Sequence, residues 1–384
     1  MRFPEFEGEW KKEQLGDTAD FSKGAGISKE QLSEKGEPCI LYGELYTKYK
    51  SEVIYDIISK TDIDSTKLVR SQANDVIIPS SGETAEDIAT ARCVLKNNIL
   101  LGGDLNIIRL HNHSGSFMSY QLNGKRKYDI AKVAQGVSVV HLYAEHLKGV
   151  NTYNPCMEEQ EKIARLLSLL DERIATQNKI IERYESLIRG LNNTLQYDTG
   201  GKSVCLGDIL LERSERSRTN NQHEVLSSTV KGIFSQREYF SKDIASENNV
   251  GYKIIRLYDV VLSPQNLWMG NINYNDRFEI GIVSPSYKVF SIADGYDNQF
   301  VASMLKTHRA LYSYMMVSEQ GASIVRRNLN MEAFSQLVFK IPSLDKQREI
   351  GYAISLLKSQ LKTANKLIKA YTSQKQYLLR QMFI

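Results

Sequence analysis

The chain has 384 residues, which is enough for two or three domains with cores of their own. Charged residues make up 24% of it and hydrophobic residues 42%, values typical of a soluble globular protein and not of a disordered or membrane-spanning one. The net charge of only +4 argues against a simple electrostatic binder of nucleic acid.

The sequence shows neither a targeting signal nor a metal-binding motif. The N-terminal residues contain no apolar signal core, and no run of about 18 apolar residues predicts a membrane span. The four cysteines, Cys39, Cys93, Cys156 and Cys205, are too far apart to predict a zinc site or a disulfide framework. We therefore expect a reduced, cytoplasmic protein.

Residues 1–152 are predicted to form a first mixed α/β module. Short apolar runs predict strands, and Gly-, Ser- and Pro-containing segments between them predict turns. The strand-like runs are residues 76–78, 99–101 and 105–110, with turns at 79–82 and 102–104.

Residues 153–196 are predicted to form a long helix that begins just after Pro155. Its apolar residues step by 4, 3, 4 and 3, which is the period of a coiled-coil seam. A helix of about 40 residues is roughly 60 Å long, far longer than a typical globular helix. The predicted seam contains Ile163, Leu167, Leu170, Ile174, Ile181 and Tyr184.

A Gly-rich break at 199–201 predicts a linker, and residues 197–341 are predicted to form a second module. Both modules begin with Leu-Gly-Asp and close with Gln-Gly, but their interiors do not align. A shared frame with different interiors favours two modules that each read a different ligand. The strand-like runs of the second module are residues 254–257, 260–262 and 287–292.

Residues 342–384 are predicted to form a second long helix, which repeats the first at an offset of 187 residues. Residues 346–384 contain eight Lys and Arg but one acidic residue, whereas residues 151–200 contain six against eight. Opposite charges favour pairing of these helices with each other, although each could also be only a solvated face. The seam contains Ile350, Ile354, Leu357, Leu361, Ile368 and Tyr371.

The repeat predicts an α+β protein with an internal pseudo-twofold. Two mixed α/β domains would be separated by two long antiparallel helices that form a coiled coil. One seam position departs from the repeat, because Lys375 occurs where the first helix has Ile188. We expect this lysine to weaken the last turns of the second helix or to face a partner.

Catalytic motifs do not occur in the sequence. It contains no P-loop, GxGxxG, HExxH or GxSxG pattern. His111 and His113 lie two residues apart without a third ligand nearby, so they predict solvated loop residues better than a metal site. We expect a non-catalytic chain without a cofactor or metal of its own.

Several stretches instead mix cations, amides and aromatic residues, a composition suited to phosphates and base edges. Polar surface loops have the same composition, so solvated loops are the alternative for each stretch. The candidate DNA-contacting residues are Tyr46, Lys48, Lys50, Lys125, Arg126, Lys127, Arg213, Arg216, Arg218, Gln265, Asn266, Trp268, Asn271, Arg326, Arg327 and Asn328.

Five segments across the chain resemble a known family. They are RFPEFEGEW (2–10), CILYGELYTKY (39–49), ILLGGDLNIIR (99–109), GIVSPSYKVF (281–290) and the helix entry P…EQxxIA…LLD (155–171). With the repeated Gln-Gly closers, they make the chain similar to the specificity (S) subunit of a type I restriction–modification enzyme. This resemblance implies two target recognition domains, each of which reads one half of an asymmetric, bipartite DNA target.

The same resemblance implies that the helical pair sets the spacer between the half-sites and docks two methyltransferase (M) subunits. Two restriction and translocase (R) subunits would join the full complex. S-adenosylmethionine, ATP and Mg would belong to these partners. Two alternatives remain open: a recognition subunit whose partner fuses methylase and nuclease, and a coiled-coil scaffold that binds no DNA.

Overall fold

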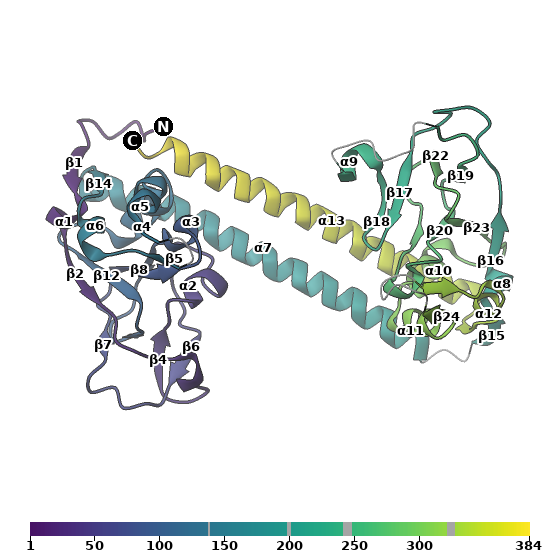
Figure 1. Ribbon diagram of the computed structural model, residues 1–384, viewed down its shortest axis with the longest axis horizontal. Coiled ribbons are helices and arrows are strands. Elements are labelled where there is room, and N and C mark those ends of the chain that lie inside the picture. Colours follow the sequence, from purple (N-terminus) through teal and green to yellow (C-terminus); the bar gives the residue numbers. More distant parts are fainter. Residues whose placement is uncertain (137–138, 198–200, 241–247, 321–326) are drawn as a thin grey trace. The chain divides into compact units, whose positions relative to one another are not determined.

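The structure is a computed structural model that divides into two compact units (Figure 1). Unit 1 contains residues 1–179 and 366–384, and unit 2 contains residues 180–365. Side chains of residues 194–197, 239, 240 and 320 are not described. The described residues are 1–136, 139–197, 201–240, 248–320 and 327–384.

Unit 1 is built on a five-stranded sheet with the order β2-β12-β8-β10-β5. The central strands β12 and β8 are apolar runs that are almost wholly buried, as expected for strands covered on both faces. The strands are β2 (Ala19–Lys23), β12 (Leu105–Leu110), β8 (Asp75–Pro79), β10 (Arg92–Val94) and β5 (Val53–Ile54).

Unit 2 repeats this sheet, although the sequences of the two modules could not be aligned. Its strand order is β16-β23-β20-β21, and all three strand pairs are antiparallel, as are β2-β12-β8-β10 of unit 1. The repeat therefore extends through the module interiors. The strands are β16 (Leu210–Arg213), β23 (Lys288–Ile292), β20 (Val260–Leu262) and β21 (Ile272–Tyr274).

Shorter elements surround each sheet. Unit 1 has two further strand pairs, β1 (Lys11–Gln14) with β14 (Asn151–Asn154) and β9 (Ser81–Gly82) with β13 (Val140–His141). Its second sheet consists of β3 (Leu32–Ser33), β6 (Ser59–Thr61), β4 (Glu37–Ile40), β11 (Leu100–Leu101) and β7 (Val69–Arg70). Its helical elements are a 3-10 turn η1 (Lys29–Gln31) and helices α1 (Leu15–Thr18), α2 (Glu44–Thr47), α3 (Ala85–Ile88), α4 (Gly115–Asn123), α5 (Lys127–Val133) and α6 (Ala144–Lys148).

Unit 2 has a smaller set of additional strands, all in antiparallel pairs. The pairs are β15 (Lys202–Cys205) with β26 (Val338–Ile341), β17 (Leu226–Thr229) with β18 (Gly232–Ser235), β19 (Lys253–Arg256) with β22 (Ile280–Val283), and β24 (Ser318–Gln320) with β25 (Arg327–Leu329). The helical elements are a 3-10 turn η2 (Leu267–Met269) and helices α8 (Leu206–Ile209), α9 (Gln236–Phe240), α10 (Asn298–Met304), α11 (His308–Met316) and α12 (Met331–Ser335).

The Leu-Gly-Asp segments form the short helices α1 and α8. A Cβ added at Gly16 would lie 2.8 Å from the Lys148 side chain, and one added at Gly207 would lie 3.0 Å from the Ser335 side chain. Glycine is therefore required for α1 to pack closely on α6, and for α8 to pack closely on α12. The leucine of each segment is wholly buried in the core of its unit.

A buried glutamine attaches each module to a long helix through the same hydrogen bonds. The Gln160 Oε1 accepts the N–H of Ser114, which is the residue that caps α4, at 3.0 Å. The Gln347 Oε1 accepts the N–H of Asp297, which caps α10, at the same distance. Each glutamine amide also donates, at 2.9 Å, to the carbonyl of the proline five residues before it.

A buried aspartate at the start of the third strand of each sheet is another shared feature. The carboxylate of Asp75 accepts the N–H of Gln72 at 2.8 Å, and that of Asp259 accepts the N–H of Arg256 at 2.7 Å. The residue before each aspartate has a positive φ, 81° for Asn74 and 76° in unit 2. The two turns are thus equivalent in backbone conformation and in hydrogen bonding.

The arginine that pairs with this aspartate comes from a different strand in each unit. In unit 1, Arg109 on β12 makes two hydrogen bonds to Asp75, at 2.8 and 2.9 Å. In unit 2, Arg213 on β16 bonds Asp259 at 2.9 and 3.0 Å. The pairing is conserved in chemistry, although the position of the cation has changed between the modules.

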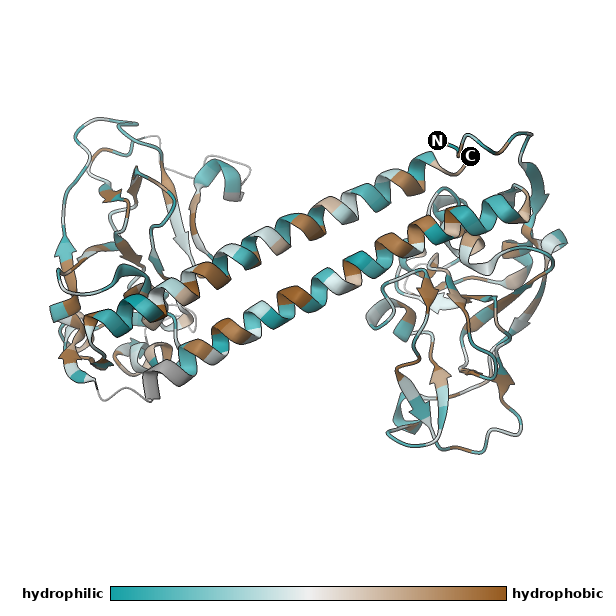
Figure 2. Cartoon of the chain, turned by 180° about the vertical axis from the view of Figure 1, so that it is seen from behind, coloured by the Kyte–Doolittle hydropathy of each residue, from teal (hydrophilic) through white to brown (hydrophobic). Residues whose placement is uncertain are grey.

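The long helices are α7 (Met157–Tyr197) and α13 (Leu344–Gln381). In unit 1 the start of α7 packs with the end of α13, and in unit 2 Leu191 near the end of α7 packs with Ile350 and Ile354 near the start of α13. Each unit therefore contains an antiparallel helix pair. Apolar residues recur along both helices among polar ones (Figure 2). The predicted fold class is confirmed.

All predicted seam residues have reduced exposure. Ile163, Leu167, Leu170, Ile350 and Ile354 are buried. The remaining members are half-buried, as expected where two helices pack without a third element to cover them. These are Ile174, Ile181, Tyr184, Leu357, Leu361, Ile368 and Tyr371.

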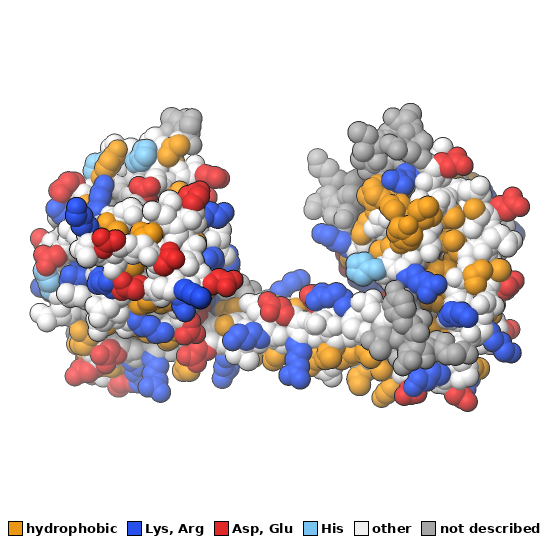
Figure 3. Space-filling model, turned by 90° about the horizontal axis from the view of Figure 1, so that it is seen from below, with side chains coloured by type: hydrophobic (Ala, Val, Ile, Leu, Met, Phe, Trp, Pro, Cys, Tyr) orange, Lys and Arg blue, Asp and Glu red, His pale blue; other side chains and the backbone are white. Residues whose placement is uncertain are grey.

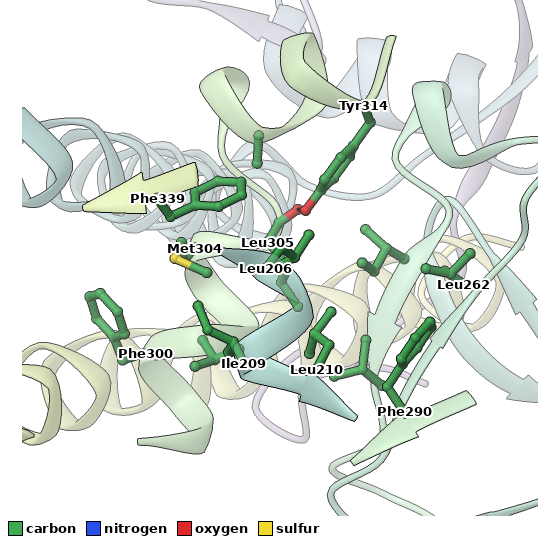
Figure 4. Packing of buried hydrophobic residues seen from close by; sticks show 14 of the residues in the cluster. Leu206, Ile209, Leu210, Leu262, Phe290, Phe300, Met304, Leu305, Tyr314 and Phe339 are labelled. Carbon is green, nitrogen blue, oxygen red and sulfur yellow. Dashed lines mark hydrogen bonds between the residues drawn. The ribbon is translucent and has the colours of Figure 1, made fainter. Parts of the chain in front are cut away.

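The main core of unit 2 connects its sheet to α13. Leu206, Ile209 and Leu210 lie beside Phe290 of the sheet and Phe300 of α10 (Figure 4). Tyr314 is wholly buried, and its hydroxyl donates to the carbonyl of Leu305 at 3.2 Å, so its polar end is satisfied. Among the described residues, no helix has the length and apolar content that are needed to cross a membrane.

Element boundaries differ modestly from those expected. The first helix begins at Met157 and not at 153, because residues 151–154 form β14, and the second begins at Leu344 and not at 342. The strands predicted at 105–110 and 260–262 are found with those bounds. The predicted linker at 199–201 falls largely outside the described residues.

Candidate nucleic-acid interface

The best-defined cation–aromatic pair in unit 2 consists of Arg327 and Trp268. The Arg327 guanidinium lies over the Trp268 ring, 4.7 Å from its centre. The backbone N–H of Arg327 donates to the carbonyl of Gln265 at 3.1 Å, which joins β25 to the η2 turn. Asn328 and Gln265 are exposed beside this pair. Arg326 lies outside the described residues.

This pair suits contact with nucleic acid. A guanidinium held over an indole ring loses less conformational freedom when it binds, and its planar donors match a phosphate or the edge of a guanine. The exposed amides of Gln265 and Asn328 add donors and acceptors of the kind that read adenine. We name Gln265, Trp268, Arg327 and Asn328 the arginine face of unit 2.

Lys306 supports this face and was not predicted from the sequence. Its ammonium donates to the carbonyl of Gly270 at 2.8 Å, and Gly270 ends the η2 turn with a left-handed φ of 92°. Burial, with a contribution from the nearby Lys358, lowers the pKa of Lys306 to about 8. Lys306 therefore fixes the turn that carries Trp268.

Two other candidates from the same stretch have structural roles. Asn271 is only 5% exposed, its amide donates to the carbonyl of Ser228 at 3.0 Å, and its oxygen accepts the Ser228 hydroxyl at 2.9 Å. It cannot contact DNA in this conformation, so its prediction as a contact is corrected. Asn266 is half-buried, and its carbonyl accepts the N–H of Asn271 at 3.2 Å.

The cations of the 213–222 stretch are also mainly structural. Arg213 pairs with the buried Asp259 and lies 3.1 Å from Glu215, which gives it a structural role, and its contact with DNA stays a prediction. Arg216 donates to the carbonyl of Gly251 at 2.9 Å. Arg218 is exposed, and only its backbone N–H is seen bonded, to the side chain of Gln222.

In unit 1 the candidate residues around α2 make hydrogen bonds and an ion pair within their own module. The Lys48 ammonium lies 2.6 Å from the buried Glu44 carboxylate and donates to the Ser59 hydroxyl at 2.7 Å. Lys50 donates to the carbonyl of Tyr46 at 2.8 Å. The Tyr46 hydroxyl donates to the carbonyl of Ser81, and burial raises the pKa of Tyr46. These interactions stabilise α2, and both lysines remain exposed.

In the basic turn between α4 and α5, one residue has structural contacts and two remain accessible. Arg126 donates to the carbonyl of Ile384 at 2.9 Å and stacks over the ring of Tyr153, 5.1 Å from its centre. It therefore has a structural role at Ile384, and its contact with DNA stays a prediction. Lys125 is exposed and Lys127 is half-buried, so both stay candidates.

Sequence reasoning missed an aromatic cluster in unit 1. The rings of His141 and Tyr143 stack at 6.2 Å, and the ring of His146 meets Tyr143 edge-on at 5.7 Å. His141 and Tyr143 occur 187 residues before Asn328 and Asn330. Applying the repeat offset to the arginine face would have found them. Unit 1 thus carries histidine and tyrosine where unit 2 carries two asparagines, and Val140 where unit 2 carries Arg327.

Charge is mixed over the described surface. Acidic and basic side chains are interspersed on the visible face of unit 1, without a continuous basic patch (Figure 3). Within the part of the chain that the structure describes, no three His, Cys, Asp or Glu side chains are grouped so as to hold a metal ion. Recognition by this chain would therefore depend on individual side chains and not on a strong positive field.

Comparison with known protein families shows which proteins this chain is similar to. Residues 7–186 match the family model described as the type I restriction modification DNA specificity domain. The match covers a little less than half of the chain, from the first module into the first long helix. The resemblance inferred from the sequence is therefore confirmed. A comparison with proteins of curated function finds no match.

Solved structures extend the likeness of fold beyond the specificity domain. The S subunit of a type I restriction–modification system from M. genitalium is 16% identical, with a TM-score of 0.65, and the match covers 100% of this chain and 99% of that one. A chain from a type I R-M system, studied for its complex assembly and conformational transition, is 13% identical with a TM-score of 0.51 and covers 98% of this chain and 97% of that one. The specificity-subunit fold thus spans both modules and both long helices.

Proposed function

We propose that this chain is the DNA-recognition subunit of a type I restriction–modification complex, in which each module reads one half of an asymmetric bipartite target. The observation that carries this proposal is the repeated frame with unlike surfaces. Both units contain the same four-strand order and the same glutamine attachment to a long helix. Their exposed chemistry differs at equivalent positions, so two different half-sites are expected.

The arginine face supplies the most specific candidate contact. Arg327 can donate two hydrogen bonds to a guanine edge or to a phosphate while it stays stacked on Trp268. The corresponding positions in unit 1 offer aromatic rings and imidazoles, which favour stacking and single hydrogen bonds. The second module would therefore depend more steeply on salt than the first.

The long helices would dock two M subunits. The exposed apolar residues of the long helices include Leu169 and Leu367 in unit 1 and Leu356 and Ile180 in unit 2, each 37–48% exposed. The residues correspond pairwise at the offset of 187. Equivalent exposed apolar residues in both units fit two copies of one partner, as a pseudo-twofold requires.

Catalysis would then belong to the partners. We propose that S-adenosylmethionine binds to the M subunits, that ATP and Mg bind to two R subunits, and that this chain neither methylates nor cleaves DNA alone. A recognition subunit with a fused methylase and nuclease partner, or a scaffold that binds no DNA, would leave the same fold but different products in the following test.

The test is co-expression with M subunits, followed by mapping of methylated adenines in the DNA of the expressing cells. We expect one asymmetric sequence with a fixed gap. Exchange of residues 1–152 for the first module of another family member should change one half of that sequence only. Changes in both halves would contradict independent reading, and methylation by this chain without M would contradict a non-catalytic role.

A further inference from the structure

The helix pair of unit 1 contains a buried group of charges at one seam position. Lys375 on α13 makes ion pairs with Glu52 of the module and with Asp171 of α7, and the three side chains are only 7–12% exposed. The sequence led us to expect that Lys375 weakens the last turns or faces a partner. Instead it joins α13 to both other parts of its own unit. We name Glu52, Asp171 and Lys375 the lysine cluster.

The module orients the acidic side of this cluster. The Asp171 carboxylate accepts the hydroxyl of Tyr120 at 2.7 Å and that of Ser51 at 2.9 Å. The Lys375 ammonium also lies 5.6 Å from the centre of the Tyr120 ring. Burial raises the pKa of both Glu52 and Tyr120. The buried Arg92 also interacts electrostatically with both carboxylates, so the two anions are matched by Lys375 of α13 and by Arg92 of the module.

The apolar seam residues alone would tolerate a shift of one heptad, although the contacts of Phe383 with Trp10 and Phe117 and the bond from Arg126 to Ile384 also fix the residues just after α13. Shifting α13 by one heptad in either direction would place Ile368 or Met382 where Lys375 now lies. Apolar residues would still meet apolar residues elsewhere, so the coiled-coil packing would be largely preserved. The shift would, however, leave the carboxylates of Glu52 and Asp171 buried without Lys375, which strongly disfavours it.

Unit 2 lacks this device at the equivalent positions. The repeat places Ile188 where unit 1 has Lys375, and Lys358 where unit 1 has Asp171. Neither residue is in an ion pair among the described residues of unit 2. The helix pair of unit 2 thus offers apolar contacts, and a single cation, without a charge complement.

We propose that the lysine cluster fixes the register between α13 and α7, which makes Lys375 a positioning residue for the separation of the two half-sites. The link to half-sites rests on the proposed function, whereas the link to register does not. A shift of seven residues would move one helix by about 10 Å along the other. That translation corresponds to roughly three base pairs at about 3.4 Å each.

Register can be measured without DNA by the distance between two nitroxide labels. The labels would be placed on exposed residues of α7 and α13 in unit 1, through Arg165→Cys and Gln374→Cys. Cys156→Ser and Cys205→Ser would remove the accessible native thiols, since Cys39 and Cys93 are buried. The chain with an intact lysine cluster should give a single distance.

The decisive variant removes the charges together: Glu52→Gln, Asp171→Asn and Lys375→Met. The buried Arg92 loses its two acidic neighbours but keeps its hydrogen bonds to the carbonyls of Leu45, Tyr49 and Ala91. The amide introduced at position 171 can still accept the hydroxyls of Ser51 and Tyr120. We expect a folded protein with a second distance population, displaced by up to about 10 Å. Lys375→Arg keeps a cation and should keep the single distance.

Ile188→Met is the matched control at the equivalent position of unit 2, and it should leave the distance unchanged. A folded triple variant with the single distance of the parent chain would overturn the proposal. Loss of folding in the triple variant, seen by circular dichroism, would also overturn it, because the cluster would then provide stability and not register. Methylation mapping is a separate readout: a broadened gap between half-sites would support the positioning role.

Discussion

The two modules agree in what holds them together and differ in what they expose. Both fix their third strand with a buried aspartate at a turn of the same geometry, and both are joined to a long helix by a buried glutamine. At equivalent positions near the end of each module, unit 1 exposes His141 and unit 2 exposes Asn328. Packing constraints thus preserve the frame, while surface positions are free to take different chemistry.

Among substitutions at positions shared by the two modules, removal of the buried aspartate should have the largest effect on stability. Asp75→Ala and Asp259→Ala each leave an arginine and a backbone N–H without their acceptor. Since the aspartates are buried and the arginines are partly exposed, we expect a loss of about 3 kcal/mol in the free energy of unfolding of the affected unit. Chemical denaturation would measure it.

Each unit contains one of the two tryptophans, Trp10 in unit 1 and Trp268 in unit 2, so each can be followed separately. Trp268→Phe leaves the fluorescence of unit 1, and Trp10→Phe leaves that of unit 2. Asp259→Ala should shift the transition seen by Trp268 and not that seen by Trp10. Equal shifts of the two unfolding transitions would show that the two units unfold together as one cooperative unit.

Removing the buried glutamine should have a somewhat smaller effect. Gln347→Ala deletes the acceptor of the Asp297 N–H and the donor to the carbonyl of Pro342, and Gln160→Ala deletes the equivalent bonds. Unsatisfied buried groups cost about 1–3 kcal/mol, so we expect about 2 kcal/mol for each variant. Thermal unfolding followed by circular dichroism would report it.

The exposed Gln360 on α13 provides the control, because Gln360→Ala removes the same amide from a position in the same helix that is not buried. It should change the free energy of unfolding by less than about 0.5 kcal/mol. The Gln160→Ala effect should slightly exceed that of Gln347→Ala, since Gln160 also bonds the imidazole of His113 at 3.0 Å. Identical values for Gln360→Ala and Gln347→Ala would remove the case for an attachment by the buried amide.

Periodic features of this fold could be predicted from the sequence, whereas features that depend on neighbours could not. The seam residues are identified by the 3.5-residue step alone, and buried strands such as residues 105–110 by an apolar run. The common sheet order could not be found, because the match between β8 and β20 is only four residues long, DVII (75–78) against DVVL (259–262), and its offset of 184 differs from the 187 of the helices. Neighbours also decide that Asn271 is interior while Gln265 is exposed, since both are amides in one polar stretch.

The arginine face provides a way to sharpen the functional difference between the modules. With the M subunits present, Arg327→Ala should weaken DNA binding by about 1–2 kcal/mol. It should also reduce the slope of log affinity against log salt, by up to about 0.9 for each phosphate that the variant no longer neutralises. Arg327→Lys should keep most of the slope but bind less tightly, because the planar stack on Trp268 is gone.

His141→Ala, in the equivalent region of unit 1, is the matched comparison. It removes an imidazole that stacks on Tyr143 and should weaken binding without the same change in slope. Fluorescence anisotropy across a salt series would measure both variants. If Arg327→Ala leaves affinity and slope unchanged but prevents association with M, the arginine face belongs to a protein interface and not to DNA.

The smallest expected effect is a pH dependence confined to unit 2. Burial lowers the pKa of Lys306 from its ordinary 10.5 to about 8, so between these values the unfolded chain binds more protons at this site than the folded one. The free energy of unfolding should therefore rise as the pH increases from about 8 towards 10.5, by an amount on the order of 1 kcal/mol. The measurement is denaturation of Lys306→Met and of the parent chain at pH 7.5 and 9.5, followed by the fluorescence of Trp268. Lys306→Met should lose the rise, because it has no ammonium to deprotonate. A parallel pH response of the two proteins would mean that Lys306 stays charged in the fold, and that its bond to the carbonyl of Gly270 offsets the cost of burial.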